Sequence, residues 1–357
     1  MATASGYPSR SQYYSAYNCL RGTAAFLFLL TAGAVAQQAP RASALPESPE
    51  KNTGGDALLW QDPTDIAIRD LRYGEGGVRD APRTTVFAFV KEDLDGSNPK
   101  FVVTDESGKR WKIKLGAEAK PEVAASRLVW AVGYFSNEDY YLPELQITGL
   151  PVKIHRGRQL IDAAGTIRGA RLQRVDKTVS KLGSWHWKKG TFTGTRELNG
   201  LRVMMALINN WDLKDINNKI DAEKNAPSRQ TYIVSDLGAS FGTTGFVLGH
   251  TKSRGNLKAF RSSHFITKET PQYIDFATPS RPTWIELVNP PQFFMRIHLR
   301  SIGKRIPRSD VQWIAGILSR LTPAQIRDAF AAAGYSPLEV EGFAGVIQER
   351  IASLGDI

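Results

Sequence analysis

Cysteine is almost absent from this sequence, and its absence excludes two kinds of site. The 357 residues contain one cysteine, Cys19, so the chain can form neither an internal disulfide framework nor a thiolate metal site. Histidine is also scarce, and the five that occur show no metal-ligand spacing. We therefore interpret each histidine as a surface or core-edge residue rather than a metal ligand.

Long hydrophobic runs are also missing, with one exception near the start of the chain. Residues 1–22 carry Arg10 and Arg21 and no acidic residue, residues 23–36 are apolar, and the run ends in Ala34-Val35-Ala36. This order is typical of a secretory signal peptide covering residues 1–36 and cleaved after Ala36. The apolar run is shorter than the roughly 20 residues of a spanning helix, so we expect no membrane span in the mature chain.

The signal peptide predicts a secreted or periplasmic protein, although its long leading region leaves an uncleaved anchor open. Cys19 would leave with the cleaved peptide. The chain carries a formal net charge of +11, with Lys and Arg spread along it and no recognisable nucleic-acid module. We interpret this excess, including the arginines of residues 168–174, chiefly as a solvated basic surface.

Secondary-structure signals divide the rest of the chain into two parts. Residues 37–82 read as a leader and a short N-terminal extension. Strands are predicted at residues 84–90, 100–104 and 109–115, and a helix from Glu118 or Pro121 to about Val132. Helical periodicity begins near residue 197, and three helices are predicted at residues 310–321, 323–333 and 337–354.

This order predicts an α+β fold with two lobes. The small β-rich lobe would span residues 83–155 and the larger helical lobe residues 156–357. With 42% hydrophobic residues the chain can build a sizeable core. We expect Trp185, Trp187 and Trp211 to belong to that core.

Two acidic motifs carry the chemistry of phosphoryl transfer. In Asp212-x-x-x-x-Asn217, Asp212 could orient or deprotonate an acceptor hydroxyl, and Asn217 offers an oxygen ligand that suits Mg²⁺. Lys214 could neutralise the moving phosphoryl group. Asp236-Leu237-Gly238 follows a short hydrophobic strand, where a carboxylate is well placed to hold a metal.

A lysine on the third strand could bind phosphates. Lys114 shares one face of that strand with Arg110 and Lys112, so Lys112 is its rival. Glu122 on the following helix could hold Lys114 in place, and Glu118 is the alternative to Glu122.

Three of these segments resemble protein kinases. Residues 212–217 resemble the kinase catalytic loop, Asp236-Leu237-Gly238 is similar to the metal-binding Asp-Phe-Gly, and Trp111-Lys112-Ile113-Lys114 resembles the Val-Ala-Ile-Lys strand. The sequence departs from standard kinases at three points. It has no Gly-x-Gly-x-x-Gly before Lys114, Asn210-Trp211 replaces the His-Arg pair, and no Ala-Pro-Glu follows Gly238.

These departures resemble an atypical branch. Residues 96–101 are similar to the phosphate-covering loop of HipA-type kinases, and phosphatidylinositol-kinase-like proteins share the later motifs. The secretory signal is similar in setting to the secretory-pathway casein kinases and CotH-type kinases. The resemblance implies that Lys114, propped by Glu122, binds ATP together with Lys100 and Gly96, and that Asn217 and Asp236 hold Mg²⁺.

The sequence therefore predicts an ATP-dependent phosphotransferase that moves the γ-phosphate to a hydroxyl group. The acceptor, a protein or a small molecule, is not specified. Two alternatives remain open on the same fold: transfer of AMP, and a pseudokinase or binding module without chemistry. The predicted catalytic residues are Asp212 and Lys214.

Overall fold

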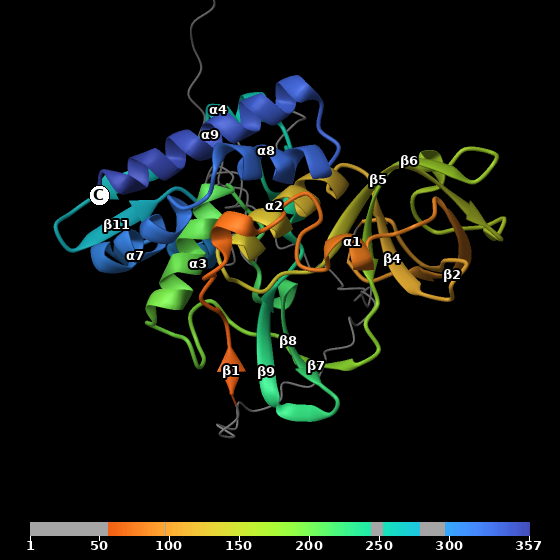
Figure 1. The fold of residues 1–357 in the computed structure, drawn as a ribbon, viewed down its shortest axis with the longest axis horizontal. Helices are drawn as coiled ribbons and strands as arrows, with labels where there is room; N and C mark the ends of the chain where they lie inside the picture. The colour runs from red at the N-terminus through yellow and green to blue at the C-terminus, as the bar shows by residue number, and fades with distance from the viewer. Residues whose placement is uncertain (1–55, 97, 244–252, 279–296) are drawn as a thin grey trace, which may run out of the picture. The chain divides into compact units, whose positions relative to one another are not determined.

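The computed structural model describes residues 56–96, 98–243, 253–278 and 297–357 (Figure 1). All of them lie in one compact unit, Pro49–Ile357. The predicted signal peptide and most of the predicted leader lie outside the described residues. Within the described residues, no helix is both long enough and apolar enough to cross a membrane.

Five strands close into a barrel: β2 (Val86–Asp93), β3 (Lys100–Thr104), β4 (Arg110–Leu115), β5 (Asp139–Thr148) and β6 (Thr166–Arg174). Their order is β2-β3-β4-β6-β5, and parallel pairing of β2 with β5 closes the ring. Alternation along β4 buries Trp111, Ile113 and Leu115 in the barrel core. The barrel includes β6, so the strand-rich part extends beyond residue 155.

The helix α2 (Ala119–Ala131) connects this barrel to the helical part of the unit. It contacts β5 and β6 on the barrel side and α8 (Pro323–Ala332) in the helical part. Its residues are mostly small or β-branched and nearly all are buried, which lets neighbours pack closely around it. In Figure 1 the barrel strands lie on one side of α2 and the C-terminal helices on the other.

Among the described residues, the helical part contains α3 (Arg196–Leu207), the short α4 (Leu257–Arg261), α7 (Arg308–Leu318), α8 and α9 (Pro337–Gly355). Four phenylalanines pack at its centre, with ring centroids of neighbouring pairs 5.0 to 6.0 Å apart: Phe241, Phe260, Phe330 and Phe343. The predicted fold class, α+β with a β-rich part before a helix-rich part, is therefore confirmed. Trp185, Trp187 and Trp211 are buried, as predicted.

Two small sheets complete the unit. One has the order β1-β9-β8-β7 and contains β1 (Ala57–Leu58), β7 (Val179–Gly183), β8 (Asn218–Glu223) and β9 (Ala226–Val234). The other has the order β10-β11-β12 and contains β10 (Ile266–Glu269), β11 (Tyr273–Phe276) and β12 (Ile306–Pro307). The antiparallel hairpin β8–β9 fills the interval between the two acidic motifs, Asn217 and Asp236.

The described part of the predicted N-terminal extension, from residue 56, contacts the centre of the unit. The indole nitrogen of Trp60 donates to the Val132 carbonyl at 2.8 Å, at the C-terminal end of α2. Arg69 donates to the Trp130 carbonyl at 2.5 Å, and the Gln325 amide on α8 donates to the Ile66 carbonyl at 2.7 Å. The extension therefore links α2 to α8.

The start of α8 gives a stability prediction. Thr322 and Gln325 form a reciprocal capping box, in which the Thr322 hydroxyl accepts from the Gln325 backbone at 3.2 Å. We expect Thr322→Ala to lower the free energy of unfolding by about 1 kcal/mol in urea titrations, because a helical N–H loses its partner. Thr322→Ser, the matched control, should retain most of the stability. Equal losses in both variants would contradict a capping role.

Candidate active site

The centre of the candidate site is the buried ammonium group of Lys114 on β4. Its side chain is 5% exposed, and its Nζ lies 2.6 Å from Glu122 Oε2, 3.3 Å from Glu118 Oε2 and 2.6 Å from Asp236 Oδ1. These carboxylates raise the pKa of Lys114 against the opposing effect of burial. Lys114 is therefore a fixed positive charge that three chain segments share.

Lys112, the rival to Lys114, lies elsewhere. Its side chain is 46% exposed and its Nζ is 3.7 Å from Asp93. Both candidate glutamates pair with this lysine, since Lys114 contacts Glu118 as well as Glu122. Glu122 makes the shorter contact and is almost fully buried, as expected of the residue that holds the lysine in place.

Glu118, at the N-terminal end of α2, joins the surrounding loops. Its Oε2 accepts a hydrogen bond from the Asn98 amide at 2.6 Å, and its Oε1 lies 2.9 Å from Arg254 Nε. A Cβ added at Gly238 would lie 2.6 Å from the Glu118 Cβ, so only glycine lets the Asp-Leu-Gly segment approach the helix this closely. The sequence offered Glu118 only as the alternative to Glu122, and neither Asn98 nor Arg254 was predicted.

Asp236 stands at a sharp change of direction after β9. Its backbone is left-handed, with φ 55° and ψ 46°, which Asp tolerates better than most side chains, and the 3₁₀ turn η4 (Leu237–Ala239) follows. Burial alone would raise the pKa of Asp236, but the positive charges of Lys114, Arg171 and Lys100 hold it below its ordinary value. The group is therefore an ionised carboxylate, available as a metal ligand.

Arg171 on β6 is a second buried cation, where the sequence predicted a solvated one. Residues 168–174 were expected to form a solvated basic loop, yet they lie in the barrel strand β6 and the Arg171 side chain is 5% exposed. Arg171 Nη2 lies 2.9 Å from Glu122 Oε1, and its Nε is 3.5 Å from Asp139 Oδ1. Glu122 is thus held from both sides, by Lys114 and by Arg171. No alternation along β6 indicates this burial, because Ala170, Arg171 and Leu172 are buried in succession.

The catalytic-loop motif forms a second, compact group. Lys214 Nζ lies 2.7 Å from Asp212 Oδ1, and the Asn217 amide donates to the Asp212 carbonyl at 2.8 Å, closing the turn η3 (Asp215–Asn217). The Asn210 side chain accepts from the Asp212 backbone at 2.9 Å. The sequence-predicted residues Asp212, Lys214 and Asn217 therefore do lie together.

Two hydrogen bonds join the two groups. The Ser235 hydroxyl donates to the Asn217 carbonyl, which ties the residue before Asp236 to the end of the catalytic-loop motif. The Trp211 backbone nitrogen donates to the Ala239 carbonyl at 3.2 Å. One side-chain and one backbone hydrogen bond thus connect the two acidic motifs.

The Gly96 loop and Lys100 lie beside Lys114. Lys100 is directly opposite Lys114 across the β3–β4 pair, so both side chains leave the same face of the sheet. Burial lowers the pKa of Lys100, and its Nζ is 3.9 Å from Asp93. Arg156 donates to the Gly96 carbonyl and, at 2.9 Å, to the Asp93 carbonyl, so the loop is anchored from outside.

The donor set suits a hard divalent cation. One carboxylate oxygen from each of Glu118, Glu122 and Asp236 lies within 4.8 Å of the others. Oxygen ligands are those that Mg²⁺ and Mn²⁺ prefer. Lys114 and Arg171 already neutralise Glu122, so Asp236, with its side chain 41% exposed, is the carboxylate best placed to accept an ion.

Comparison with known proteins gives structural likenesses alone. No family model and no curated protein matches the chain. The Helicobacter pylori proinflammatory kinase CtkA aligns at 10% identity over 76% of this chain and 97% of its own, with a TM-score of 0.44. The Golgi casein kinase aligns at 12% identity over 83% and 79%, with a TM-score of 0.33. Its Mn/ADP-bound form aligns at 10% identity over 76% and 71%, with a TM-score of 0.38.

At these identities and scores, the case for a function rests on the side chains described above. All three of these structures are of kinases.

The buried position of Arg171 gives a second stability prediction. Arg171→Met should lower the free energy of unfolding by about 3 kcal/mol, because it leaves Glu122 and Asp139 buried with less compensating charge. The matched control is Arg168→Met on the same strand, where the side chain is 85% exposed and 3.8 Å from Glu144. The control should change stability by less than about 0.5 kcal/mol in urea titrations. Similar losses at both positions would contradict a buried network.

Proposed function

We propose that this chain is an ATP-dependent phosphotransferase of the atypical kinase type, with a HipA-like or phosphatidylinositol-kinase-like core. One observation carries the proposal: Lys114 is buried between Glu122 and Asp236, which come from α2 and from the segment after β9. A solvated basic strand would not bury its lysine among three carboxylates, because desolvating such charges is costly. Positioning phosphates and a divalent cation is a function that requires this arrangement.

The proposed nucleotide site lies along β3, β4 and the loop before them. Lys114, positioned by Glu122, would bind the α- and β-phosphates, and Lys100 would assist from the neighbouring strand. Gly96, with φ of 65°, allows the loop to turn above the phosphates. Asp236 and Asn217 would hold Mg²⁺, with Glu118 nearby, and a bound ion would neutralise charge on the phosphates.

The proposed chemistry belongs to the catalytic loop. Asp212 would orient the acceptor hydroxyl and accept its proton as the γ-phosphate is transferred. Lys214, 2.7 Å from Asp212, would neutralise charge on the transferred group. The predicted signal peptide supports the further proposal that the protein acts in a secreted or periplasmic setting.

The alternatives differ in what they require of these residues. A pseudokinase or binding module needs no base, and the close grouping of Asp212 with Lys214 and Asn217 therefore favours an enzyme. Transfer of AMP would use the same groups with the nucleotide bound in another orientation. The acceptor is a hydroxyl group on a protein or a small molecule.

Nucleotide binding gives the first functional prediction. ATP with Mg²⁺ should raise the melting temperature of the wild type, because a ligand that binds only the folded state stabilises it. Asp236→Ala should remove the Mg²⁺-dependent part of the rise, whereas Lys112→Met should retain it. Thermal-shift titrations with ATP, with Mg²⁺ and with both would measure this. If ATP and Mg²⁺ leave the melting temperature of the wild type unchanged, the proposal is contradicted.

The second functional prediction concerns which phosphate of ATP is transferred, measured with radioactive ATP. With acceptor supplied, label should move from γ-³²P-ATP and not from α-³²P-ATP, which separates phosphoryl from AMP transfer. Asp212→Ala should lower the rate at least about 100-fold, since a positioned base contributes that much, while nucleotide-induced stabilisation persists. An Asp212→Ala variant with full activity would remove Asp212 from its assigned role.

A further inference from the structure

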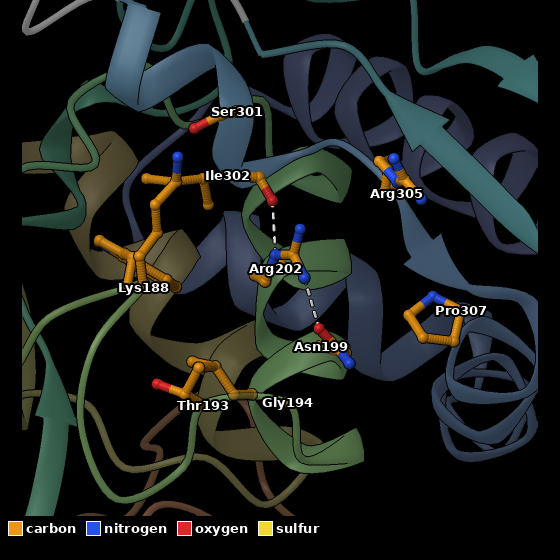
Figure 2. Close-up of a pocket in the computed structure, with 11 residues that line it drawn as sticks. Lys188, Thr193, Gly194, Asn199, Arg202, Ser301, Ile302, Arg305 and Pro307 are labelled. Atoms are coloured by element: carbon orange, nitrogen blue, oxygen red, sulfur yellow. Dashed lines mark hydrogen bonds between the residues drawn. The ribbon is translucent and has the colours of Figure 1, made fainter.

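A cavity of about 420 Å³ lies outside the proposed nucleotide site, a size that suits a small organic ligand. Its walls come from the loop before α3, from the first turns of α3 and from the segment 301–307 (Figure 2). None of the predicted catalytic, metal or nucleotide residues lines it.

Within the described part of the chain, the charged residues that line the cavity all have the same sign. They are Lys188, Arg202 and Arg305, and no acidic side chain among the described residues belongs to the lining. The carboxylate of Asp310 binds the Asn199 amide at 2.7 Å and acts on Arg202 from a distance, but does not itself line the cavity. A cluster of three cations in a concave site attracts anions.

Arg202 is the fixed element of this cluster. Figure 2 shows its guanidinium between Asn199 and Ile302. It donates to the carbonyls of Ile302 at 2.5 Å and Lys304 at 2.6 Å, and to the Asn199 side chain. These partners carry no charge, and burial lowers the pKa of Arg202 to about 10, still well above neutrality. The group therefore stays positive at neutral pH without a carboxylate in direct contact.

The surroundings of the cavity also favour an anion. The cavity adjoins the N-terminal end of α3, where Thr193 and Gly194 precede the helix and the helix dipole is positive. Arg305 is held over the Tyr273 ring at 5.1 Å and is thus kept in a defined position. The apolar lining residues Trp187, Leu198 and Ile302 are nearly fully buried and leave the open surface chiefly to the other lining residues.

The cavity wall also contacts the catalytic loop. The backbone nitrogen of Trp187 donates to Asp215 Oδ1 at 3.1 Å, and His186 Nδ1 lies 2.9 Å from Asp215 Oδ2. Asp215 is three residues from Asp212. A ligand in the cavity would therefore bind next to the segment that supports the proposed catalytic residue.

We propose that this cavity is a second ligand site, which binds a small organic anion through its phosphate or carboxylate group. The site goes beyond the proposed phosphotransferase function, and its occupation does not depend on that function being correct.

Calorimetric titration with phenyl phosphate tests the site, with phenol as the uncharged probe of similar shape. Wild type should bind phenyl phosphate more tightly than phenol, and the affinity should fall as salt is raised. Lys188→Met and Arg305→Met should each weaken phenyl phosphate binding about tenfold, the loss of one charge-assisted hydrogen bond. Lys189→Met is the matched control, because Lys189 follows Lys188 but does not line this cavity.

The outcomes separate the possibilities. Selective weakening in Lys188→Met and Arg305→Met, with Lys189→Met unchanged, supports the site. Phenyl phosphate binding that is equal in all four proteins would come from another part of the chain, such as the nucleotide site, and would overturn the proposal. Equal affinity for phenol and phenyl phosphate, or no binding by the wild type, would overturn it as well. Unfolding curves of the variants should match the wild type, since both substituted side chains are exposed.

Discussion

The need to compensate buried charge dominates the centre of this protein. Lys114 and Arg171 have side chains that are each 5% exposed, and a buried cation without partners would cost several kcal/mol. Their partners come from α2, from β5 and from the segment after β9. Barrel, helix and hairpin are therefore fixed relative to one another because each supplies a carboxylate to the same cluster. Replacing this cluster with apolar side chains would fill the space equally well, so its retention favours function over stability.

The backbone around the cluster is shaped to let these groups meet. Asp236 takes a left-handed conformation, and Gly238 leaves room for Glu118, so α2 and the segment after β9 approach closely. The catalytic loop is then attached by two hydrogen bonds, from the Ser235 hydroxyl to the Asn217 carbonyl and from the Trp211 backbone nitrogen to the Ala239 carbonyl. Such attachment contributes to the precise positioning that phosphoryl transfer depends on.

Local signals in the sequence predicted the elements well, and long-range signals were missing. Strand β3 and the start of α8 were predicted at the residues where they occur, because turns and caps are encoded by neighbouring residues. The sequence predicted a pair of Lys114 with Glu122 and kept Glu118 as the alternative, and the structure brings both glutamates to this lysine. The burial of Lys114 was not predicted.

Arg171 shows why the remainder of the site was not predictable. Whether an arginine on a strand faces solvent or a carboxylate depends on which strand lies beside it, and β6 pairs with both β4 and β5 across large sequence separations. Seven residues from six separate places in the chain meet in the cluster. The hydrophobic periodicity of a single segment does not indicate which distant segments its side chains will contact.

The charge count of this cluster has a consequence for the proposed nucleotide site. Lys114, Arg171 and Arg254 face four carboxylates, which are Glu118, Glu122, Asp139 and Asp236. Burial raises the pKa of Asp139 to about 7, so near neutrality part of its charge is removed and the cluster ranges from neutral to one negative charge. Lys100, the other cation beside Lys114, is paired with Asp93 at 3.9 Å, so the site has little surplus of positive charge with which to hold the phosphates of a nucleotide. A divalent cation beside Asp236 would supply that surplus, and a requirement for metal in nucleotide binding therefore follows from the electrostatics of the chain itself.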